Sequence, residues 1–232
     1  MFSDHFLDAN ILVGSRISWD RQYNGTTRYM ALEGIRRHTS KRVYYESRGV
    51  FERSRGLILK YLKRFYEEFN RSRDPMRLDQ IIRAFTRKFS GSLGEKESKI
   101  LNSFVERNFM EIRNTALGGE REFGDFRRAI IDAFMGAINS IDRDCYSDPK
   151  AVICRYDDCP PDYRNCYAAE NNRLLKVINY ESDVLVALDS YFIRNKYIKT
   201  NVCFVTTDHE HMLKNKAEIE SILTGIFIMQ PR

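Results

Sequence analysis

The chain has 232 residues, of which 30% are charged and 43% hydrophobic, and its mean hydropathy is −0.50. This composition is typical of a soluble globular protein, and the length suffices for one α/β domain with an insertion. No apolar run approaches the ~20 residues that span a bilayer, and residues 1–5 lack the features of a secretory signal, so we expect a cytoplasmic protein without membrane contact.

The net charge of +6 is unevenly distributed along the chain. Residues 36–88 contain 16 Lys and Arg against six Asp and Glu, a balance of +10 that leaves −4 for the rest. Concentrated positive charge is typical of a surface that meets a polyanion, most commonly nucleic acid. A solvated helix face has the same pattern, so charge alone leaves both interpretations open.

Residues 6–14 form an apolar run that is interrupted by Asp8 and Asn10 and stops at Gly14. The pattern predicts a buried strand with a polar pair at one end. Ligands of open α/β sheets lie outside the carboxyl ends of the strands. We therefore expect Asp8 to face a site and to need partners of its own kind further along the chain.

The next segments predict a helix, a strand and a second helix. A turn at residues 24–25 precedes a helix that starts near Thr26 or Thr27 and runs to about residue 37, and residues 42–45 have the composition of a short strand. Behind them, apolar residues recur at helical spacing with basic residues between them. The apolar positions are Phe51, Ile58, Leu62, Phe65 and Phe69, and the basic positions, for which we predict nucleic-acid contacts, are Arg48, Arg53, Arg55, Lys60, Lys63 and Arg64.

The middle of the chain predicts a helical insertion followed by a loop-rich segment. Residues 74–140 have helical periodicity and no strand pattern, with a capping box at Ser92 and Glu95, a helix end at residues 118–119 and a further helix from 120 to about 140. Residues 142–172 are rich in Pro and Asp. This segment holds Cys145, Cys154, Cys159 and Cys166 without a Cys-x-x-Cys knuckle, which favours reduced thiols over structural Zn²⁺ and leaves zinc as the less favoured alternative.

The last third predicts helices from residue 172 and over about 182–195, a strand at 202–205, a helix over 210–223 and a closing strand at 226–229. Two predicted strands thus end in an acid, Asp8 and Asp208, and Asp183 lies at a helix start between them. An acid in a first turn is often only a response to the helix dipole. That explanation covers Asp183 alone but not the whole set.

In this order the segments resemble the PIN domain, a family of metal-dependent nucleases. The opening Phe-Leu-Asp-Ala-Asn-Ile-Leu-Val resembles the family's first strand, with its Asp-x-Asn signature at Asp8 and Asn10. Residues 42–52 are similar to its second strand and to the helix with its second acid. Residues 181–187 resemble the helix with the third acid, and residues 205–208 resemble the strand end with its hydroxyl residue and fourth acid. The resemblance covers about the first 60 and last 60 residues.

The resemblance implies a Rossmann-like α/β fold of three layers with a central parallel sheet. The core would comprise residues 1–70 and 171–232, and residues 71–170 would form the insertion. It also implies an Mg²⁺ or Mn²⁺ site, to which the oxygen ligands of carboxylates are suited. The implied metal ligands and catalytic residues are Asp8, Glu52, Asp183 and Asp208, supported by Asn10, Thr206 and Glu210, with Glu46 left open as an alternative to Glu52.

The expected activity is hydrolysis of RNA phosphodiester bonds, most simply by an endoribonuclease, since a bound metal can activate water and stabilise the leaving oxygen. A catalytically degenerate PIN-like module that binds RNA or protein and a toxin-type nuclease restrained by a partner are the alternatives. A homodimer and an inhibitory or scaffold protein are left open as partners. A haloacid-dehalogenase phosphatase would need a second Asp where Asn10 stands. His209 and His211 are expected to be partly exposed helix-start residues rather than ligands, because their spacing matches no defined metal motif.

Overall fold

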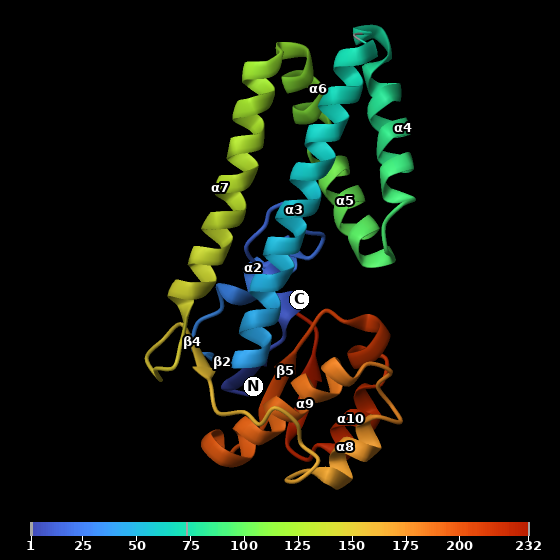
Figure 1. Ribbon diagram of the computed structural model, residues 1–232. Helices are drawn as coiled ribbons and strands as arrows, with labels where there is room; N and C mark the ends of the chain where they lie inside the picture. Colours follow the sequence, from blue (N-terminus) through green and yellow to red (C-terminus); the bar gives the residue numbers. More distant parts are fainter. Residues whose placement is uncertain (1, 73, 232) are drawn as a thin grey trace. The chain divides into compact units, whose positions relative to one another are not determined.

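The structure is a computed structural model that describes residues 2–72 and 74–231. The chain forms two units, which are described separately. The first unit comprises residues 1–16, 22–48 and 139–232 and contains the whole sheet, and the second comprises residues 17–21 and 49–138 and is helical (Figure 1). The main segment of the second unit begins at residue 49, before the predicted insertion over 71–170, and ends at residue 138, before the predicted end. No helix in the described part of the chain is both long and apolar enough to cross a membrane.

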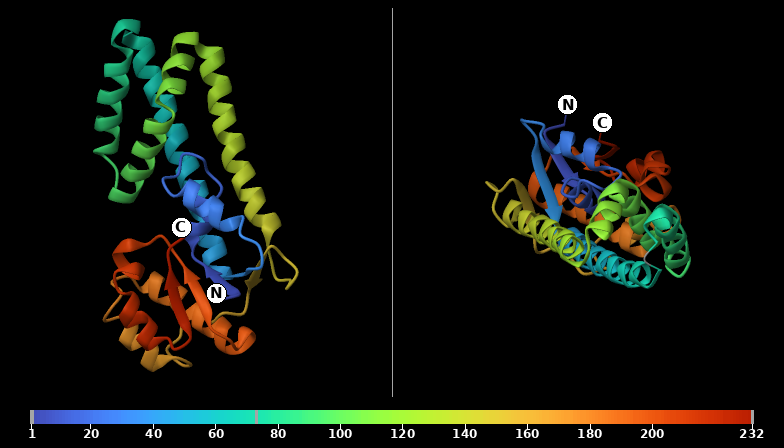
Figure 2. Two further views of the ribbon diagram at one scale, coloured as in Figure 1. Left: turned by 180° about the vertical axis from the view of Figure 1, so that it is seen from behind. Right: turned by 90° about the horizontal axis from the view of Figure 1, so that it is seen from above.

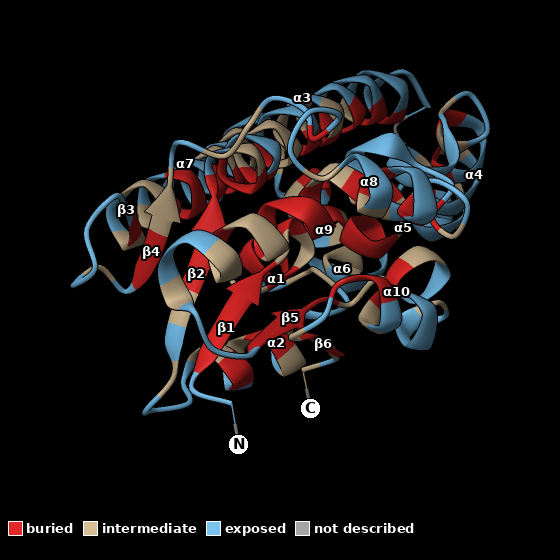
Figure 3. Cartoon of the chain, turned by 90° about the horizontal axis from the view of Figure 1, so that it is seen from below, coloured by how far each residue is buried: buried red, intermediate tan, exposed pale blue. Residues whose placement is uncertain are grey.

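The first unit is built on a six-stranded sheet in which every pair of neighbouring strands is parallel. The strand order is β3-β4-β2-β1-β5-β6, so β1 is central, with His5 opposite Arg37 of β2 on one side and Cys203 of β5 on the other. All residues of β1 and β5 are buried, as Figure 3 shows. This confirms the predicted parallel α/β sheet and the strands at 202–205 and 226–229. The strands are β1 (Asp4–Leu7), β2 (Arg36–Ser40), β3 (Cys145–Tyr146), β4 (Ile153–Tyr156), β5 (Val202–Val205) and β6 (Ile226–Met229).

Helices flank this sheet and connect its strands. The longest helix that lies wholly in the first unit is α9 (Glu181–Ile193), which packs against β2 and β5 and buries Val184, Leu188 and Ile193. The strand β5 is apolar along its whole length, as is typical of parallel strands that are buried on both faces. The other helices are α1 (Ala9–Gly14), α2 (Tyr23–Met30), α8 (Ala168–Leu174) and α10 (Lys216–Ile222), with short helical turns at Arg194–Ile198 and His209–Leu213.

The second unit is a set of helices, which Figure 2 shows from two further sides. Its core is rich in aromatic side chains. The five apolar positions predicted between residues 51 and 69 are buried, which confirms the amphipathic helix. The Tyr61 ring stacks on Phe65 and packs at steeper angles against Phe85 and Phe89. Its hydroxyl lies 2.8 Å from Thr86 Oγ1. The helices that contribute to this unit are α3 (Lys41–Ser72), α4 (Leu78–Ser90), α5 (Glu95–Arg107), α6 (Phe109–Gly118) and α7 (Glu120–Asp144), with a short turn at Pro75–Arg77.

Two predictions near the amino terminus were wrong. Residues 9–14 form α1 instead of continuing the strand, because Asp8 Oδ1 accepts the backbone N–H of Ala9 at 2.7 Å and caps a helix. Residues 42–45 lie in α3, and the strand is β2, in a segment predicted to end a helix. The sequence of β2 is Arg-Arg-His-Thr-Ser, so its hydropathy gave no strand signal although His38 and Thr39 are buried.

The predicted features of the middle segment also need correction. Ser92 does not cap a helix, since its hydroxyl donates to the carbonyl of Phe89 at 2.7 Å and Gly94 precedes α5. The predicted helix that ends at residue 118 is divided at Asn108 into α5 and α6. The segment predicted to be loop-rich contains β3 and β4, which are short and lie at one edge of the sheet.

Candidate functional site

The two predicted acids, Asp8 and Asp208, follow neighbouring strands of the sheet, β1 and β5. After β1 the chain continues to β2 on one side, whereas after β5 it continues to β6 on the other side. Such a topological switch point is where open α/β sheets bind their ligands. Asp8 N donates to Val205 O at 3.1 Å and Thr206 N donates to Met229 O at 3.0 Å, so the sheet itself positions both residues.

Side-chain hydrogen bonds join the ends of β1 and β5. Asp8 Oδ2 accepts from Asn10 Nδ2 and from Thr206 Oγ1, each at 2.7 Å. Thr206 Oγ1 in turn accepts from Asn10 Nδ2 and from the backbone N–H of Asp208, each at 3.0 Å. Asn10 Oδ1 accepts from the backbone N–H of Thr207 at 3.0 Å. Because Thr206 is fully buried, this network fixes the direction of the Asp8 carboxylate.

Three further side chains gather at this end of the sheet. Asp183, in the first turn of α9, Asp208 and His211 each offer one ligand atom, and these atoms lie within 4.8 Å of one another. Asp208 Oδ1 accepts the backbone N–H groups of Glu210 and His211 at 2.9 and 3.1 Å, which caps the turn that carries His211. The His211 ring packs edge-on against Tyr180, with 4.7 Å between centroids. Carboxylate oxygens and an imidazole nitrogen this close together are donors that suit a divalent cation.

The charged residues that act most strongly on Asp8 are themselves acids. The pKa of Asp8 is raised to about 7, first by burial and then by the negative charges of Glu46 and Asp183, although hydrogen bonds from Thr206 and Ala9 act in the opposite direction. Burial and like charges both favour the neutral form of a carboxyl group. A bound cation would remove this penalty.

For the second acid of the PIN resemblance, the sequence pattern favours Glu52, whereas the structure favours Glu46. Glu46 belongs to the first unit and its charge acts on Asp8. Glu52, the residue predicted from the family's spacing, belongs to the second unit and is exposed there. The side chain of Glu210 is also exposed, and only its backbone N–H contacts Asp208. The structure thus brings together Asp8, Asn10, Asp183, Thr206 and Asp208, with Glu46 beside them.

The predicted nucleic-acid contacts divide between the units. In the first unit, Arg48 Nη1 lies 3.2 Å from Asp142 Oδ1 and 3.1 Å from the hydroxyl of Tyr44. In the second unit, Arg55 contacts the sulfur of Met135 at 3.0 Å, and Lys63 lies 4.0 Å from Glu67. Of the six predicted contact residues, Arg53, Lys60, Lys63 and Arg64 are exposed.

The cysteines do not gather at one place. Cys145 and Cys154 are buried on neighbouring strands, Cys159 is half-buried and Cys166 is exposed, and all are free thiols. Burial raises the pKa of Cys145 to about 12, so its thiol stays protonated. Among the described residues these cysteines do not form a metal-binding group. Cys203 lies buried in β5, in accord with its predicted place in the core.

The sequence did not indicate that His211 lies near Asp183 and Asp208, nor did it indicate the role of Asp189. His211 was expected to be a partly exposed helix-start residue, and its one-residue separation from His209 gave no metal motif. Asp189 is fully buried in α9, where it accepts from Tyr163 OH at 2.7 Å and pairs with Arg42 Nε at 3.3 Å. Arg42 also donates to the carbonyls of Pro160 and Pro161, each at 3.1 Å. In the sequence, Asp189 is a lone acid in an apolar helical run, which was the available signal. Through Arg42 it anchors the loop that contains Pro160 and Pro161.

Comparisons of the chain with protein-family models, with curated proteins and with solved structures gave no match. Any function must therefore be inferred from the residues at the ends of β1 and β5 and from the charge of the chain.

Proposed function

We propose that the protein is a PIN-like, metal-dependent ribonuclease whose site lies at the carboxyl ends of β1 and β5. The observation that carries this proposal is the convergence of Asp8, Asp183 and Asp208 at the switch point of the sheet, where Asn10 and Thr206 orient Asp8. The same residue types in the same chain order led to the PIN resemblance. The acid best placed to complete the set is Glu46, because its charge acts on Asp8.

The donors at this site fit Mn²⁺ particularly well. Asp183 and Asp208 provide carboxylate oxygens, which suit both Mg²⁺ and Mn²⁺. The His211 ring adds a nitrogen donor, which suits transition metals better than Mg²⁺. When bound, the divalent cation lowers the pKa of a coordinated water and stabilises charge on phosphate oxygens.

The residues around the donors keep the site in one arrangement. Thr206 and Asn10 hold the Asp8 carboxylate at the end of β1, and the turn capped by Asp208 holds His211. A fixed geometry lowers the barrier because the reacting groups need not reorganise. RNA as the substrate class rests on the PIN resemblance together with the balance of +10 over residues 36–88.

The decisive test replaces Asp8 by Asn and follows cleavage of a labelled RNA with Mn²⁺. We expect Asp8→Asn to abolish cleavage, because the amide removes a negative charge and a metal-binding oxygen while keeping the shape of the side chain. Asp132→Asn is the matched control, since Asp132 is an exposed acid of α7. Cleavage by Asp8→Asn at the wild-type rate would refute the assignment. Binding of RNA by the wild type without cleavage in Mg²⁺ or Mn²⁺ would instead favour the degenerate module.

A further inference from the structure

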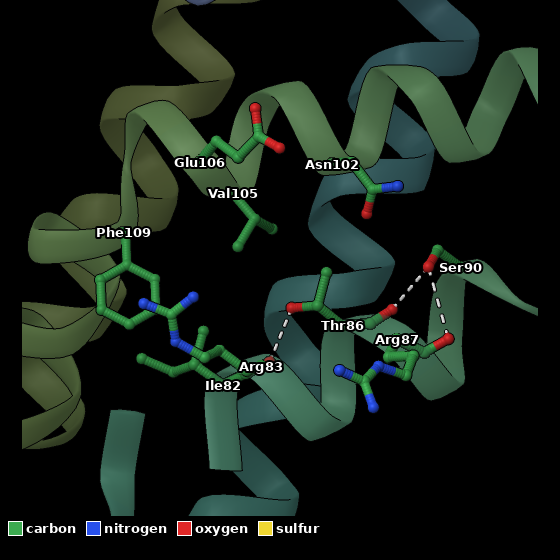
Figure 4. Close-up of a pocket in the computed structure, with 9 residues that line it drawn as sticks. All are labelled: Ile82, Arg83, Thr86, Arg87, Ser90, Asn102, Val105, Glu106 and Phe109. Carbon is green, nitrogen blue, oxygen red and sulfur yellow. Dashed lines mark hydrogen bonds between the residues drawn. The ribbon is translucent and has the colours of Figure 1, made fainter. Parts of the chain in front are cut away.

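A cavity of about 650 Å³ lies in the second unit, between α4 and α5 and beside the first residue of α6 (Figure 4). Its volume is in the range of pockets that bind small ligands. The residues that decide its chemistry are Ile82, Arg83, Arg87, Asn102, Val105 and Phe109. None of them belongs to the proposed nuclease site.

The charged side chains that line this cavity are Arg83, Arg87 and Glu106. Arg83 and Arg87 lie one helical turn apart on α4 and both are exposed. Within the described residues, neither guanidinium makes a hydrogen bond or an ion pair, and Arg83 lies 5.0 Å from the centre of the Phe109 ring. Glu106, on α5, lies 3.7 Å from Arg21. The guanidinium groups therefore retain their capacity for an external anion, and a guanidinium fork matches the oxygens of a phosphate.

The rest of the lining is suited to a flat, partly apolar group. Ile82 and Val105 are buried beneath the cavity, and the Phe109 ring is half-buried at one side. Asn102, on α5, adds an amide that can both donate and accept. Unpaired nucleobases bind to proteins by stacking on aromatic rings and arginine planes and by hydrogen bonds to their edges.

We propose that this cavity binds one nucleotide of single-stranded RNA. The guanidinium groups of Arg83 and Arg87 hold a phosphate, and the base lies on the apolar floor beside Phe109 and Asn102. The choice of RNA rests on the proposed function, whereas the preference for a phosphate and a flat group rests on the cavity itself. A continuous polyanion also accords with the positive charge of residues 36–88.

The test measures binding of a fluorescent single-stranded RNA of about 12 nucleotides by anisotropy, in chelator so that cleavage is suppressed. We expect Arg87→Ala to weaken binding about tenfold and to reduce the slope of log affinity against log salt by about 1. Lys88→Ala is the matched control, because Lys88 is the next residue of α4, is exposed and does not line the cavity. Equal losses in the two variants would mean diffuse attraction and would overturn the proposal.

A second variant keeps the charge and fills the cavity. Asn102→Phe should weaken single-stranded RNA binding while the circular dichroism spectrum stays helical, and RNA that contains 4-thiouridine should crosslink to the peptide with Phe109. Tighter binding of duplex RNA or of polyglutamate than of single-stranded RNA would refute the assigned ligand. Binding in chelator that is sensitive to Arg87→Ala, together with no cleavage by the wild type in a separate assay with Mg²⁺ or Mn²⁺, would refute the nuclease and leave the cavity proposal intact. Cleavage combined with binding insensitive to Arg87→Ala would do the reverse.

Discussion

At the scale of single residues, Thr206 connects the two central strands through one hydroxyl group. That group donates to Asp8 Oδ2 and accepts from Asn10 and from the backbone of Asp208. Valine has nearly the same shape as threonine but would leave these buried polar groups without a partner. The consequence should be visible both in stability and in metal binding.

We expect Thr206→Val to lower the free energy of unfolding by about 1–3 kcal/mol, the cost of an unsatisfied buried polar group. Urea denaturation monitored by circular dichroism measures this change. Thr207→Val is the control, because Thr207 contacts Asn10 through its backbone N–H. If both variants were equally stable, the network would contribute little to the fold.

Asp8 gives a prediction about pH. Its pKa is raised from 3.8 to about 7 in the folded protein, so the unfolded chain releases this proton at lower pH and stability falls as pH rises through that interval. In chelator we expect the stability of Asp8→Asn relative to the wild type to be higher at about pH 8 than at about pH 4 by about 1 kcal/mol, a value reduced for the partial exposure of Asp8.

The advantage of Asp8→Asn should shrink as the pH is lowered below the folded pKa of Asp8, because the wild-type carboxyl group then becomes neutral as well. Thermal unfolding at several pH values measures the difference. Added Mn²⁺ should raise the melting temperature of the wild type and have less effect on the variant. A constant difference between the two proteins at all pH values would contradict the assigned pKa.

At the scale of elements, the start of α3 determines which glutamate has a charge that acts on Asp8. The helix begins at Lys41, directly after β2, so Glu46 lies in its second turn. The sequence pattern placed a strand at residues 42–45 and thereby shifted the expected acid to Glu52. The position of a helix start therefore changed a prediction about chemistry.

We expect Glu46→Gln to weaken Mn²⁺ binding about tenfold, a typical effect for residues that act on metal ligands. Glu52→Gln should leave it unchanged, and because both residues are exposed glutamates of α3 each variant controls for the other. Isothermal titration calorimetry with Mn²⁺ separates them. Loss of Mn²⁺ binding only in Glu52→Gln would mean that Glu52, the residue expected from the PIN resemblance, is the second acid.

Several elements could be predicted because their buried positions are occupied by apolar residues in a regular pattern. The strands β5 and β6 are apolar runs, and the buried positions of α3 recur at helical spacing. In β2 the buried residues are polar and have their hydrogen-bond partners on β1, since His38 lies 2.9 Å from Asp4 and Thr39 donates to the carbonyl of Leu7 at 3.3 Å. Such pairing depends on strands far apart in the sequence, and a local pattern cannot contain it.

The candidate site could be predicted in part for the same reason. Acids that follow apolar runs marked Asp8 and Asp208, because the end of a strand is a local property. The approach of His211 to Asp183 and Asp208 depends on how a short turn meets α9, and no spacing rule describes it. The cavity between α4 and α5 likewise required the packing of two helices.

At the scale of the whole molecule, the chain leaves the first unit near residue 48 and returns near residue 139. These two points are close, because Tyr44 OH donates to Asp142 Oδ1 at 2.7 Å and Arg48 lies 3.2 Å from the same carboxylate. A short Gly/Ser linker can therefore replace the segment between them. Ile17 and Trp19 belong to the second unit, where Trp19 packs edge-on against Phe104 and Phe134.

We expect a variant that joins residue 48 to residue 139 and replaces Ile17 and Trp19 by Ser to fold, because all six strands lie in the first unit. It should unfold cooperatively in urea and still bind Mn²⁺. Its affinity for single-stranded RNA should be lower than that of the full chain measured in parallel. Absence of a cooperative transition would mean that the sheet depends on the helical segment.

The position of β1 in the sheet has a consequence for biosynthesis. His5 pairs with Arg37 on one side but with Cys203 on the other, so one edge of β1 stays open until the ribosome has made almost the whole chain. Contacts between residues so distant in sequence form late, and an open strand edge invites pairing with other chains. The helices between residues 49 and 138 are synthesised before β5. A nascent chain that stalls before residue 202 should therefore hold a folded helical segment and an exposed β1 edge, which makes it a substrate for chaperones.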